Sequence, residues 1–156
     1  MEIEMDGKIA AFWRRFLEKT GRGAGTPLYE SFHFDLNEKA ANQLLAMVLG
    51  GQKTATSSSA LALGEQGKPP QVGSLSIVTD FAGNPACVIE TTAITVIPYK
   101  DMTFDICRRE GEDDCLESWQ RTHTRYFFEE AALLGYAFTP DMPVIFEDFR
   151  VVYREG

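Results

Sequence analysis

The sequence predicts an α+β fold, built around a small mixed or antiparallel sheet or barrel. Three observations support this prediction: two amphipathic helical patterns near the N-terminus, a β-hairpin pattern in the middle, and a further helical region followed by a final strand pattern. The chain has 156 residues, the length of one ordinary domain, and its 44% hydrophobic content is enough for a real core. We therefore expect a single domain over residues 1–156.

Two helices are predicted near the N-terminus, because apolar residues recur there every three or four positions. In the first helix the apolar face comprises Ile9, Phe12, Trp13, Phe16 and Leu17. In the second it comprises Ala41, Leu44, Leu45, Val48 and Leu49. Asp35 and Glu38 have the spacing of a capping box for the second helix, and Gly50 and Gly51 are expected to end it.

The middle of the chain predicts a hairpin. Residues 73–80 and 86–98 are rich in Val, Ile and Thr, and residues 81–85 between them are typical of a turn. Residues 142–153 predict another strand, and residues 31–34 a short one. A weak helical pattern covers residues 103–110, and a long one covers residues 115–135. Its expected apolar face comprises Leu116, Trp119, His123, Phe127 and Leu134.

Composition and charge exclude several classes of protein. No run of about 18 apolar residues exists, and the acidic start does not have the form of a signal peptide, so we expect a cytoplasmic protein without a membrane span. Three cysteines without a CxxC pair, and only two histidines, argue against a disulfide framework or a zinc site. The net charge of −8 argues against non-specific binding to a long nucleic acid, so any such contact needs a local basic patch or a small ligand.

The polar stretch "GGQKTATSSS", residues 50–59, is the first candidate site. Lys53 could bind an anion or oxyanion, and the hydroxyl groups that follow it could donate hydrogen bonds or act as nucleophiles. The alternative is a solvated polar loop after a helix, which local composition alone favours.

The acidic stretch "EGEDD", residues 110–114, is the second candidate. Its carboxylates could hold a divalent metal ion. Alternatively, Asp114 and Glu117 form a capping box for the long helix, which leaves Glu110 and Glu112 unexplained. His123 is either a hydrogen-bonded core residue or a proton carrier, and Cys87 is expected to be an inert core residue.

Four separate stretches together resemble the ASCH domain of the PUA-like superfamily. These stretches are "GQKTATSS", "GNPACVIETTAITVIPY", "EGEDDCLESWQRTHTRYF" and "MPVIFEDFRVVY". The resemblance implies a PUA-like small β-barrel with flanking helices and a cleft on one side. It divides the chain into an N-terminal helix and linker, residues 1–26, and an ASCH core, residues 27–153.

The resemblance also implies a function related to RNA or nucleosides. ASCH domains have been linked to RNA binding and to ribonuclease activity. A short bacterial branch hydrolyses the N-acetyl amide of N4-acetylcytidine, using a lysine, a threonine three residues later and a distant glutamate. Lys53 and Thr56 match that spacing, and Glu112 matches the glutamate, with Glu110 as the other option. The implied catalytic residues are therefore Lys53, Thr56 and Glu112.

An RNA-binding surface is the second expectation from the resemblance. Lys53, Arg121 and Arg125 would contact phosphate, and Trp119 or Tyr126 would stack on a base if exposed. The full expected set of nucleic-acid-binding residues is Lys53, Ser57, Ser58, Trp119, Arg121, His123 and Arg125. A non-enzymatic module that binds RNA or protein is the third alternative.

The chemistry depends on the charge of Lys53. A lysine acts as a base only when it is neutral, and burial or a neighbouring cation is needed to favour the neutral form. A nearby Glu112 has the opposite effect, because its negative charge favours the charged lysine. We therefore expect that a Lys53 paired with Glu112 is charged and stabilises an oxyanion or phosphate, while Glu112 or a water that it activates moves the proton. No organic cofactor is expected, because no glycine-rich phosphate motif follows a strand. A divalent ion at residues 110–114 and a homodimer remain open.

Overall fold

The structure is a computed structural model that describes residues 7–63 and 67–155. Its α-helices are α1 (Gly7–Thr20), α2 (Glu38–Leu49), α3 (Phe104–Cys107) and α4 (Leu116–Leu134). Its strands are β1 (Glu30–Phe32), β2 (Ala55–Ser59), β3 (Leu75–Thr79), β4 (Pro85–Pro98) and β5 (Pro143–Arg154). Short 3-10 turns follow several of them: η1 (Ala60–Leu63), η2 (Tyr99–Asp101) and η3 (Arg108–Glu110). The predicted α+β class is confirmed.

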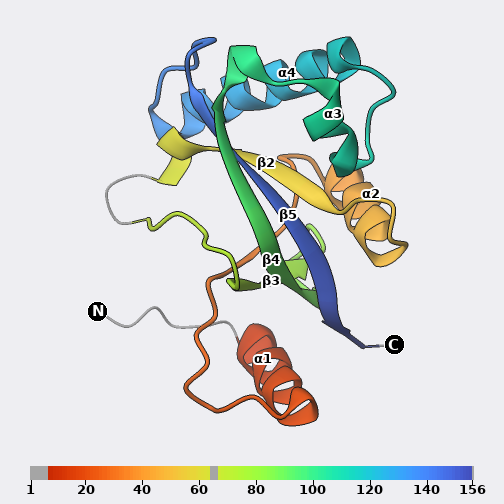
Figure 1. Ribbon diagram of the computed structural model, residues 1–156. Helices are drawn as coiled ribbons and strands as arrows, with labels where there is room; N and C mark the ends of the chain where they lie inside the picture. Colours follow the sequence, from red (N-terminus) through yellow and green to blue (C-terminus); the bar gives the residue numbers. More distant parts are fainter. Residues whose placement is uncertain (1–6, 64–66, 156) are drawn as a thin grey trace.

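The five strands form one mixed sheet in the order β1-β3-β4-β5-β2. β1 runs parallel to β3, and the other three pairings are antiparallel, including the predicted β3–β4 hairpin. The long β4 and β5 strands cross the molecule (Figure 1), and their pairing shifts register at Val88/Ile89 and at Thr91/Ala93. Such irregularities increase strand twist, which fits the curled, half-barrel shape of this sheet.

Three apolar clusters hold helices against this sheet. Figure 1 shows α3 and α4 at one end of the long strands, α1 at the other end, and α2 beside β2 and β5. The α4 cluster centres on Trp119, Phe127 and Phe146, and the α1 cluster on Phe12 and Phe16. The α2 cluster joins Leu45 and Val48 to β3, β4 and β5. The sheet is therefore covered by different helices along its length, and the site described below lies between α2 and α4.

The N-terminal helices confirm the predicted apolar faces, but one predicted cap is wrong. All five predicted residues of α1 are buried. In α2, the N-cap is Asn37, whose Oδ1 accepts a hydrogen bond from the Ala40 N–H at 2.8 Å. Asp35 instead accepts a hydrogen bond from the Leu36 N–H, at 2.6 Å, so the Asp35–Glu38 capping box does not form. Gly50 and Gly51 end the helix as predicted.

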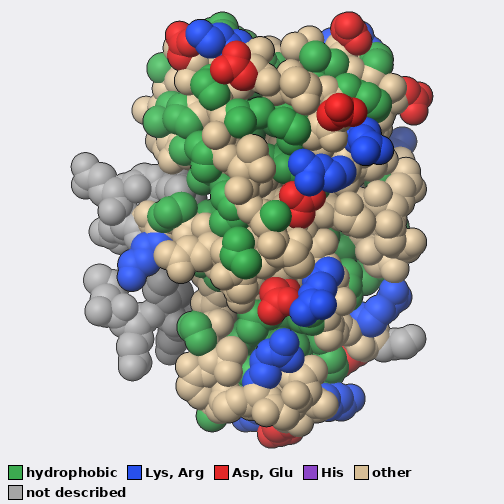
Figure 2. All heavy atoms as spheres, in the orientation of Figure 1, with side chains coloured by type: hydrophobic (Ala, Val, Ile, Leu, Met, Phe, Trp, Pro, Cys, Tyr) green, Lys and Arg blue, Asp and Glu red, His purple; other side chains and the backbone are tan. Residues whose placement is uncertain are grey.

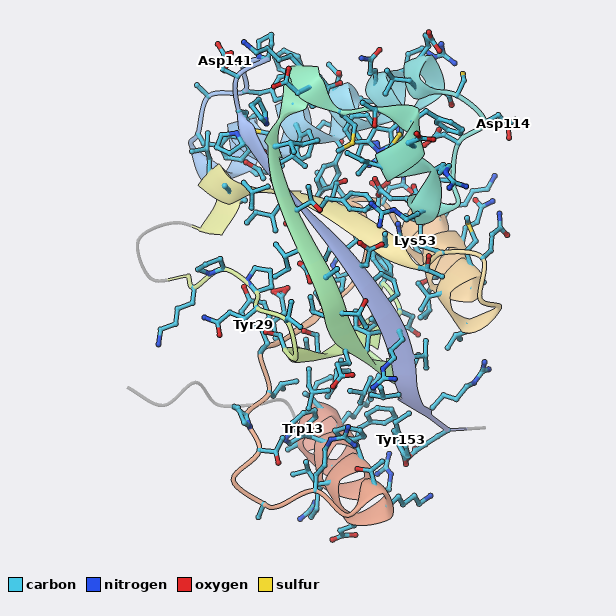
Figure 3. All side chains as sticks on the ribbon, in the orientation of Figure 1. Trp13, Tyr29, Lys53, Asp114, Asp141 and Tyr153 are labelled. Atoms are coloured by element: carbon cyan, nitrogen blue, oxygen red, sulfur yellow. The ribbon has the colours of Figure 1, made fainter. Side chains whose placement is uncertain are left out.

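The predicted capping box of α4 is also wrong. Cys115 is the N-cap and makes no side-chain capping bond, and Asp114 lies on the outer loop before the helix (Figure 3). Asp113 instead accepts a hydrogen bond from Ser118 Oγ at 2.6 Å. Leu134 was expected on the buried face, yet it is 58% exposed in the last helical turn. Ala131, four residues after Phe127, takes the buried position.

The stretch after α2 is not a solvated loop, which corrects the interpretation that its composition favoured. Ala55–Ser59 is an edge strand, β2, that pairs along its whole length with β5. Ala55 and Ser59 are fully buried. Backbone pairing with an apolar neighbour places this polar segment in the sheet, although its own side chains predict a loop.

Two other expectations concern location and cysteines. Within residues 7–63 and 67–155, no helix is long and apolar enough to span a membrane. The acidic residues 1–6, which contributed to the signal-peptide argument, lie outside the described residues. All three cysteines are free, and Cys87 is buried in β4 as expected.

Candidate functional site

Lys53 and the acidic stretch are brought together by the segment that precedes β2. The Thr54 N–H donates to the Arg109 carbonyl at 3.2 Å, and Gln52 Nε2 donates to the Gly111 carbonyl at 2.9 Å. Gly111 has φ +75°, and a Cβ at this position would lie 2.2 Å from the Gln52 carbonyl oxygen. The glycine therefore permits a backbone approach that no other residue could make without a shift. This approach aligns residues 52–54 with residues 109–111.

Lys53 is buried among three acceptors. Only 2% of the residue is exposed, and its ammonium contacts Glu112 Oε2 at 2.6 Å, the Ala55 carbonyl at 2.8 Å and Glu110 Oε1 at 3.4 Å. The Phe34 ring centroid lies 5.3 Å from the same nitrogen. An ammonium has three donors and no acceptor, which matches three surrounding oxygen acceptors. This geometry fits a charged lysine. Lys53 contacts both candidate glutamates, Glu110 and Glu112, and not only one of them.

Glu110 is a buried carboxylate that accepts hydrogen bonds from several donors. Besides Lys53, its oxygens contact Trp119 Nε1 at 2.6 Å, Ser57 Oγ at 2.8 Å and His123 Nε2 at 3.3 Å. Burial alone would raise the pKa of Glu110, but the charges of His123 and Lys53, with the hydrogen bonds from His123 and Trp119, lower it well below its usual range. Glu110 is therefore ionised in the folded protein.

His123 is packed and bonded on both sides. Its ring lies against the Trp119 indole, with centroids 4.2 Å apart, and its Nδ1 lies 2.9 Å from the Trp119 carbonyl. Its Nε2 faces Glu110. Both nitrogens therefore face acceptors, an arrangement that fits the imidazolium form. Burial works to lower the pKa of His123, but the charge and hydrogen bond of Glu110, the charge of Glu112 and the hydrogen bond with the Trp119 backbone together raise it.

Lys53, Glu110, Glu112 and His123 thus form a charged cluster, and this name is used for them below. Two cations balance two carboxylates, and this mutual attraction offsets the cost of removing the charges from water. Glu110, Glu112 and His123 present ligand atoms within 4.8 Å of one another, a spacing that could also hold a metal ion. The Lys53 ammonium already lies against both carboxylates, so a divalent ion would have to displace it.

The charged cluster opens into a cleft of about 310 Å³. One wall is the cluster itself with Ser57, which donates to Glu110. The other wall comprises Tyr29, Glu30 and Glu147, with Thr56 beside Glu147 in the paired strand. In Figure 3, Tyr29 lies across β4 and β5 from Lys53. The remaining aromatic lining consists of Phe32, His33, Phe34 and Tyr126.

The polar side chains of β2 and of Thr54, just before it, differ in their bonding. Thr54 Oγ1 donates to the Arg109 carbonyl, Ser57 to Glu110, and Ser59 to Met142 Sδ. Among the described residues, neither the Thr56 nor the Ser58 hydroxyl makes a side-chain hydrogen bond, although both line the cleft. These two hydroxyls are therefore free to contact a ligand.

Some of the expected nucleic-acid-binding residues lie away from the cleft. Trp119 is fully buried, so its indole is a core element that holds Glu110 and is not available to stack on a base. Arg121 and Arg125 are exposed on α4, and neither is among the described residues that line the cleft. Tyr126 does line it, with its hydroxyl donating to Glu130 Oε2 at 2.7 Å.

Sequence reasoning missed the carboxylates of the opposite wall. Glu147 lies in β5, directly across from Thr56 in β2, and its Oε2 accepts a hydrogen bond from Thr91 Oγ1 at 3.1 Å. Burial, with the nearby charge of Glu30, raises the pKa of Glu147 to about 7. An acidic residue inside an apolar strand pattern was the available signal, but it could not show which residue lies opposite.

Comparisons with known proteins bear on the family and the fold of the chain. The ASCH domain model matches residues 30–153. The chain belongs to the ASCH domain family. It is similar to the crystal structure of an ASCH domain from Lactobacillus crispatus JV V101, with 31% identity and a TM-score of 0.83, over 96% of this chain and 97% of that one. A crystal structure of a protein from Enterococcus faecalis V583 is 30% identical, with a TM-score of 0.84, over 95% of this chain and 90% of that one.

These matches confirm the resemblance inferred from the four sequence stretches. A comparison with curated proteins gives no match. The family match begins at β1 and ends within β5, and the two structures cover nearly the whole chain, including most of the segment before β1. The ASCH domain thus includes both walls of the cleft.

Proposed function

We propose that this ASCH domain binds a modified nucleoside, or one nucleotide of an RNA, in the cleft and hydrolyses an amide on it. The observation that supports this most is the charged cluster: it holds a buried lysine beside a cleft that also contains the free hydroxyl of Thr56. Lys53 and Thr56 have the spacing found in the family's N4-acetylcytidine amidohydrolases, and Glu112, with Glu110 as the other option, takes the place of their distant glutamate. The ligand we propose is therefore an N4-acylated cytidine.

The dimensions of the cleft support a small ligand. A volume of about 310 Å³ lies at the lower end of the range for small-molecule pockets. The chain has a net charge of −8, and on the face shown in Figure 2 its Lys and Arg side chains are interspersed with Asp and Glu. A long RNA strand binds best to a continuous basic surface. These features favour one nucleoside or a short single strand.

The aromatic residues around the cleft provide surfaces for the base. Phe32, Phe34, Tyr29 and Tyr126 all line it. A base that stacks on an aromatic ring gains about 1–3 kcal/mol per stacked base, whatever its identity. These residues replace Trp119 in the role that the sequence suggested for it.

Lys53 is proposed to stabilise the negative charge that develops on the amide oxygen. Its contact with Glu110, at 3.4 Å, is the longest of its three, and Glu110 also has Trp119 and Ser57 as donors. A developing oxyanion could therefore replace this contact without leaving Glu110 unpaired. Such a fixed positive charge in a site with little water accelerates acyl transfer strongly.

Glu112 is proposed to carry the proton for the leaving amine. It lies at the edge of the charged cluster, its side chain is 15% exposed, and it lines the cleft. Burial and the neighbouring Glu110 raise the pKa of Glu112, while Lys53 lowers it, and the net direction is upward. A carboxyl group that takes up a proton more readily than usual is suited to return one to a leaving group.

The first test incubates the protein with N4-acetylcytidine and with short RNA, each with and without a chelator. Cytidine and acetate formed without a metal support the proposal. Chelator-sensitive RNA cleavage would support a nuclease, with a metal in place of Lys53. Binding without turnover would support a recognition module. We keep the cytoplasm as the proposed location, and the oligomeric state is measured on the same samples.

The second test replaces Lys53 by methionine. Loss of the ammonium should lower kcat by about 100-fold or more, as does loss of an oxyanion-stabilising donor in other acyl-transfer enzymes. Lys100→Met is the matched control, because Lys100 is an exposed residue paired with Asp141 outside the cleft. A Lys53→Met variant that folds and turns over acetylcytidine at the wild-type rate would refute the role of the lysine.

A further inference from the structure

A second proton-binding group lies next to Thr56, on the opposite wall from the charged cluster. Thr56 in β2 is paired with Glu147 in β5, and both line the cleft. Residues directly opposite in an antiparallel pair point to the same face of the sheet, with Cβ atoms about 4.5–5.5 Å apart. A glutamate side chain is long enough to bring a carboxylate oxygen to a threonine hydroxyl across this distance.

Glu147 is held in place by a hydrogen bond to one of its two carboxylate oxygens. Its Oε2 accepts the hydrogen bond from Thr91. In the part of the chain that the structure describes, no hydrogen bond reaches its other oxygen, Oε1. The register shift at Thr91/Ala93 is what sets Thr91 across from Phe149 and Ala93 across from Asp148. Thr91 therefore fixes one oxygen of Glu147, while the other is free to face the Thr56 hydroxyl.

The charged cluster cannot take the proton of Thr56 as readily. Lys53 is surrounded by three acceptors and has no lone pair to offer while it is an ammonium. Glu112 is committed to Lys53 at 2.6 Å. A threonine hydroxyl is a weak nucleophile unless a base accepts its proton. The proposed hydrolysis therefore needs another acceptor.

We propose that Glu147 is that acceptor: it removes the proton from Thr56 as the hydroxyl attacks the amide carbonyl. This inference rests on the proposed hydrolysis and names a catalytic residue that the family spacing of Lys53, Thr56 and Glu112 does not include. The two walls then have different roles. Glu147 accepts the proton of the nucleophile, whereas the charged cluster stabilises the oxyanion and protonates the leaving group.

Thr56 Oγ1 forms a bond to the carbonyl carbon, its proton passes to Glu147, and the π electrons move to the carbonyl oxygen, which Lys53 stabilises. When the carbonyl re-forms, the C–N bond breaks and the nitrogen takes the proton of Glu112 where Glu112 is protonated, or otherwise the proton held by Glu147. Water then attacks the acyl-threonine and its proton passes to the carboxylate that was left ionised, while the acyl–oxygen bond breaks and Thr56 Oγ1 takes a proton back from Glu147. The products are the free amine and the carboxylic acid.

The surroundings of Glu147 favour a base that works near neutral pH. The titratable groups that face it are Glu30 in β1 and Tyr29 just before it. Burial, together with the charge of Glu30, raises the pKa of Glu147 from its ordinary value of 4.5 to about 7, although the Thr91 hydrogen bond works in the opposite direction. A general base is most effective when its pKa lies close to the operating pH.

The deciding experiment is a pH profile of kcat/KM for N4-acetylcytidine with wild type, Glu147→Gln and Glu30→Gln. Below a pH of about 7, the kcat/KM of wild type should fall about tenfold for each pH unit. In Glu147→Gln, kcat/KM should be lower by about 100-fold or more at pH 7.5, and the decline at acidic pH, the acidic limb of the profile, should be absent. Glu30→Gln, which removes a like charge, should move the limb to lower pH, an effect that a purely structural role would not produce.

Glu90→Gln is the matched control, because Glu90 pairs with Arg150 on the surface of the same sheet. It should leave both rate and profile unchanged. If Glu147→Gln folds and keeps the wild-type rate and limb, Glu147 is not the base, and the proposed hydrolysis still stands on the wild-type turnover. If Glu147→Gln does not fold, an unmoved limb in Glu30→Gln overturns the inference. If wild type releases no acetate, the proposed hydrolysis fails and this inference fails with it.

Discussion

On one wall of the cleft, Glu110 and Glu112 face Lys53 and His123, and nearly every polar atom of these residues has a partner. On the other wall, Glu147 is influenced by a second carboxylate, Glu30, and is bonded to a neutral hydroxyl. The pKa of Glu110 is lowered, whereas the pKa of Glu147 is raised. Burial acts to raise the pKa of both glutamates, yet the results are opposite, because the neighbouring charges have opposite signs.

This difference suits the two walls to different chemical roles. In the balanced wall Glu110 stays ionised, so it can hold Lys53 in place and let the lysine offer a constant positive charge to a ligand. The unbalanced wall can gain or lose a proton at little cost near neutral pH. Sites that pair a fixed charge with a titratable group are suited to acid–base chemistry. The predictions below each disturb one wall and leave the other intact.

The largest effect on stability is expected from Glu110→Gln. This change keeps the size of the side chain but leaves Lys53 and His123 with one carboxylate instead of two. Removing one partner of a buried charged group costs about 3–5 kcal/mol, because the remaining charge is left uncompensated. Chemical denaturation at pH 7 measures the loss. Glu117→Gln, an exposed glutamate in the first turn of α4, is the control and should change stability by less than about 0.5 kcal/mol.

Gly111→Ala should destabilise the protein by about 2–4 kcal/mol and displace the acidic stretch. The alanine Cβ would lie 2.2 Å from the Gln52 carbonyl oxygen, in a backbone conformation with φ +75°. Gly135→Ala separates these two causes, because Gly135 has φ +83° but open space around it. It should cost only about 1–2 kcal/mol. Equal losses of stability in the two variants would mean that the close approach to Gln52 contributes nothing.

How much of this could be read from the sequence depends on the range of the interactions. The buried face of α1 and the β3–β4 hairpin are local patterns, and both were predicted correctly. The importance of Glu110 and Glu112 was visible because capping left them unexplained. The two capping boxes were wrong because neighbouring residues, Asn37 and Cys115, occupy the N-cap positions instead.

Non-local pairing accounts for what could not be predicted. The polar segment 55–59 forms a strand only because β5, almost ninety residues later in the chain, lies beside it. The same pairing places Glu147 opposite Thr56, which no spacing in the sequence reveals. The family resemblance supplied Lys53 and Thr56, and the structure added that Lys53 joins both glutamates and that Trp119 is buried.

The smallest expected effect is a pH dependence of stability that belongs to Glu147 alone. Its pKa in the folded protein, about 7, lies above its ordinary value of 4.5. The folded state therefore binds more protons than the unfolded state between these two values. The stability that the protonated carboxyl contributes is fully present below pH of about 4.5 and is lost as the pH rises through about 7. Glu110 behaves in the opposite way, since its pKa is lowered and its contribution is lost only as the pH falls.

The measurement is the difference in unfolding free energy between wild type and Glu147→Gln from pH 4.5 to 8. Because Gln cannot titrate, the variant should gain about 1–3 kcal/mol relative to wild type across this range, and most of the gain should fall between pH 5.5 and 7.5. Glu90→Gln should show a constant difference. A constant difference in Glu147→Gln as well would mean that Glu147 is ionised throughout. The two walls would then not differ in the way their neighbouring charges indicate, and Glu147 would have no proton affinity suited to a base at neutral pH.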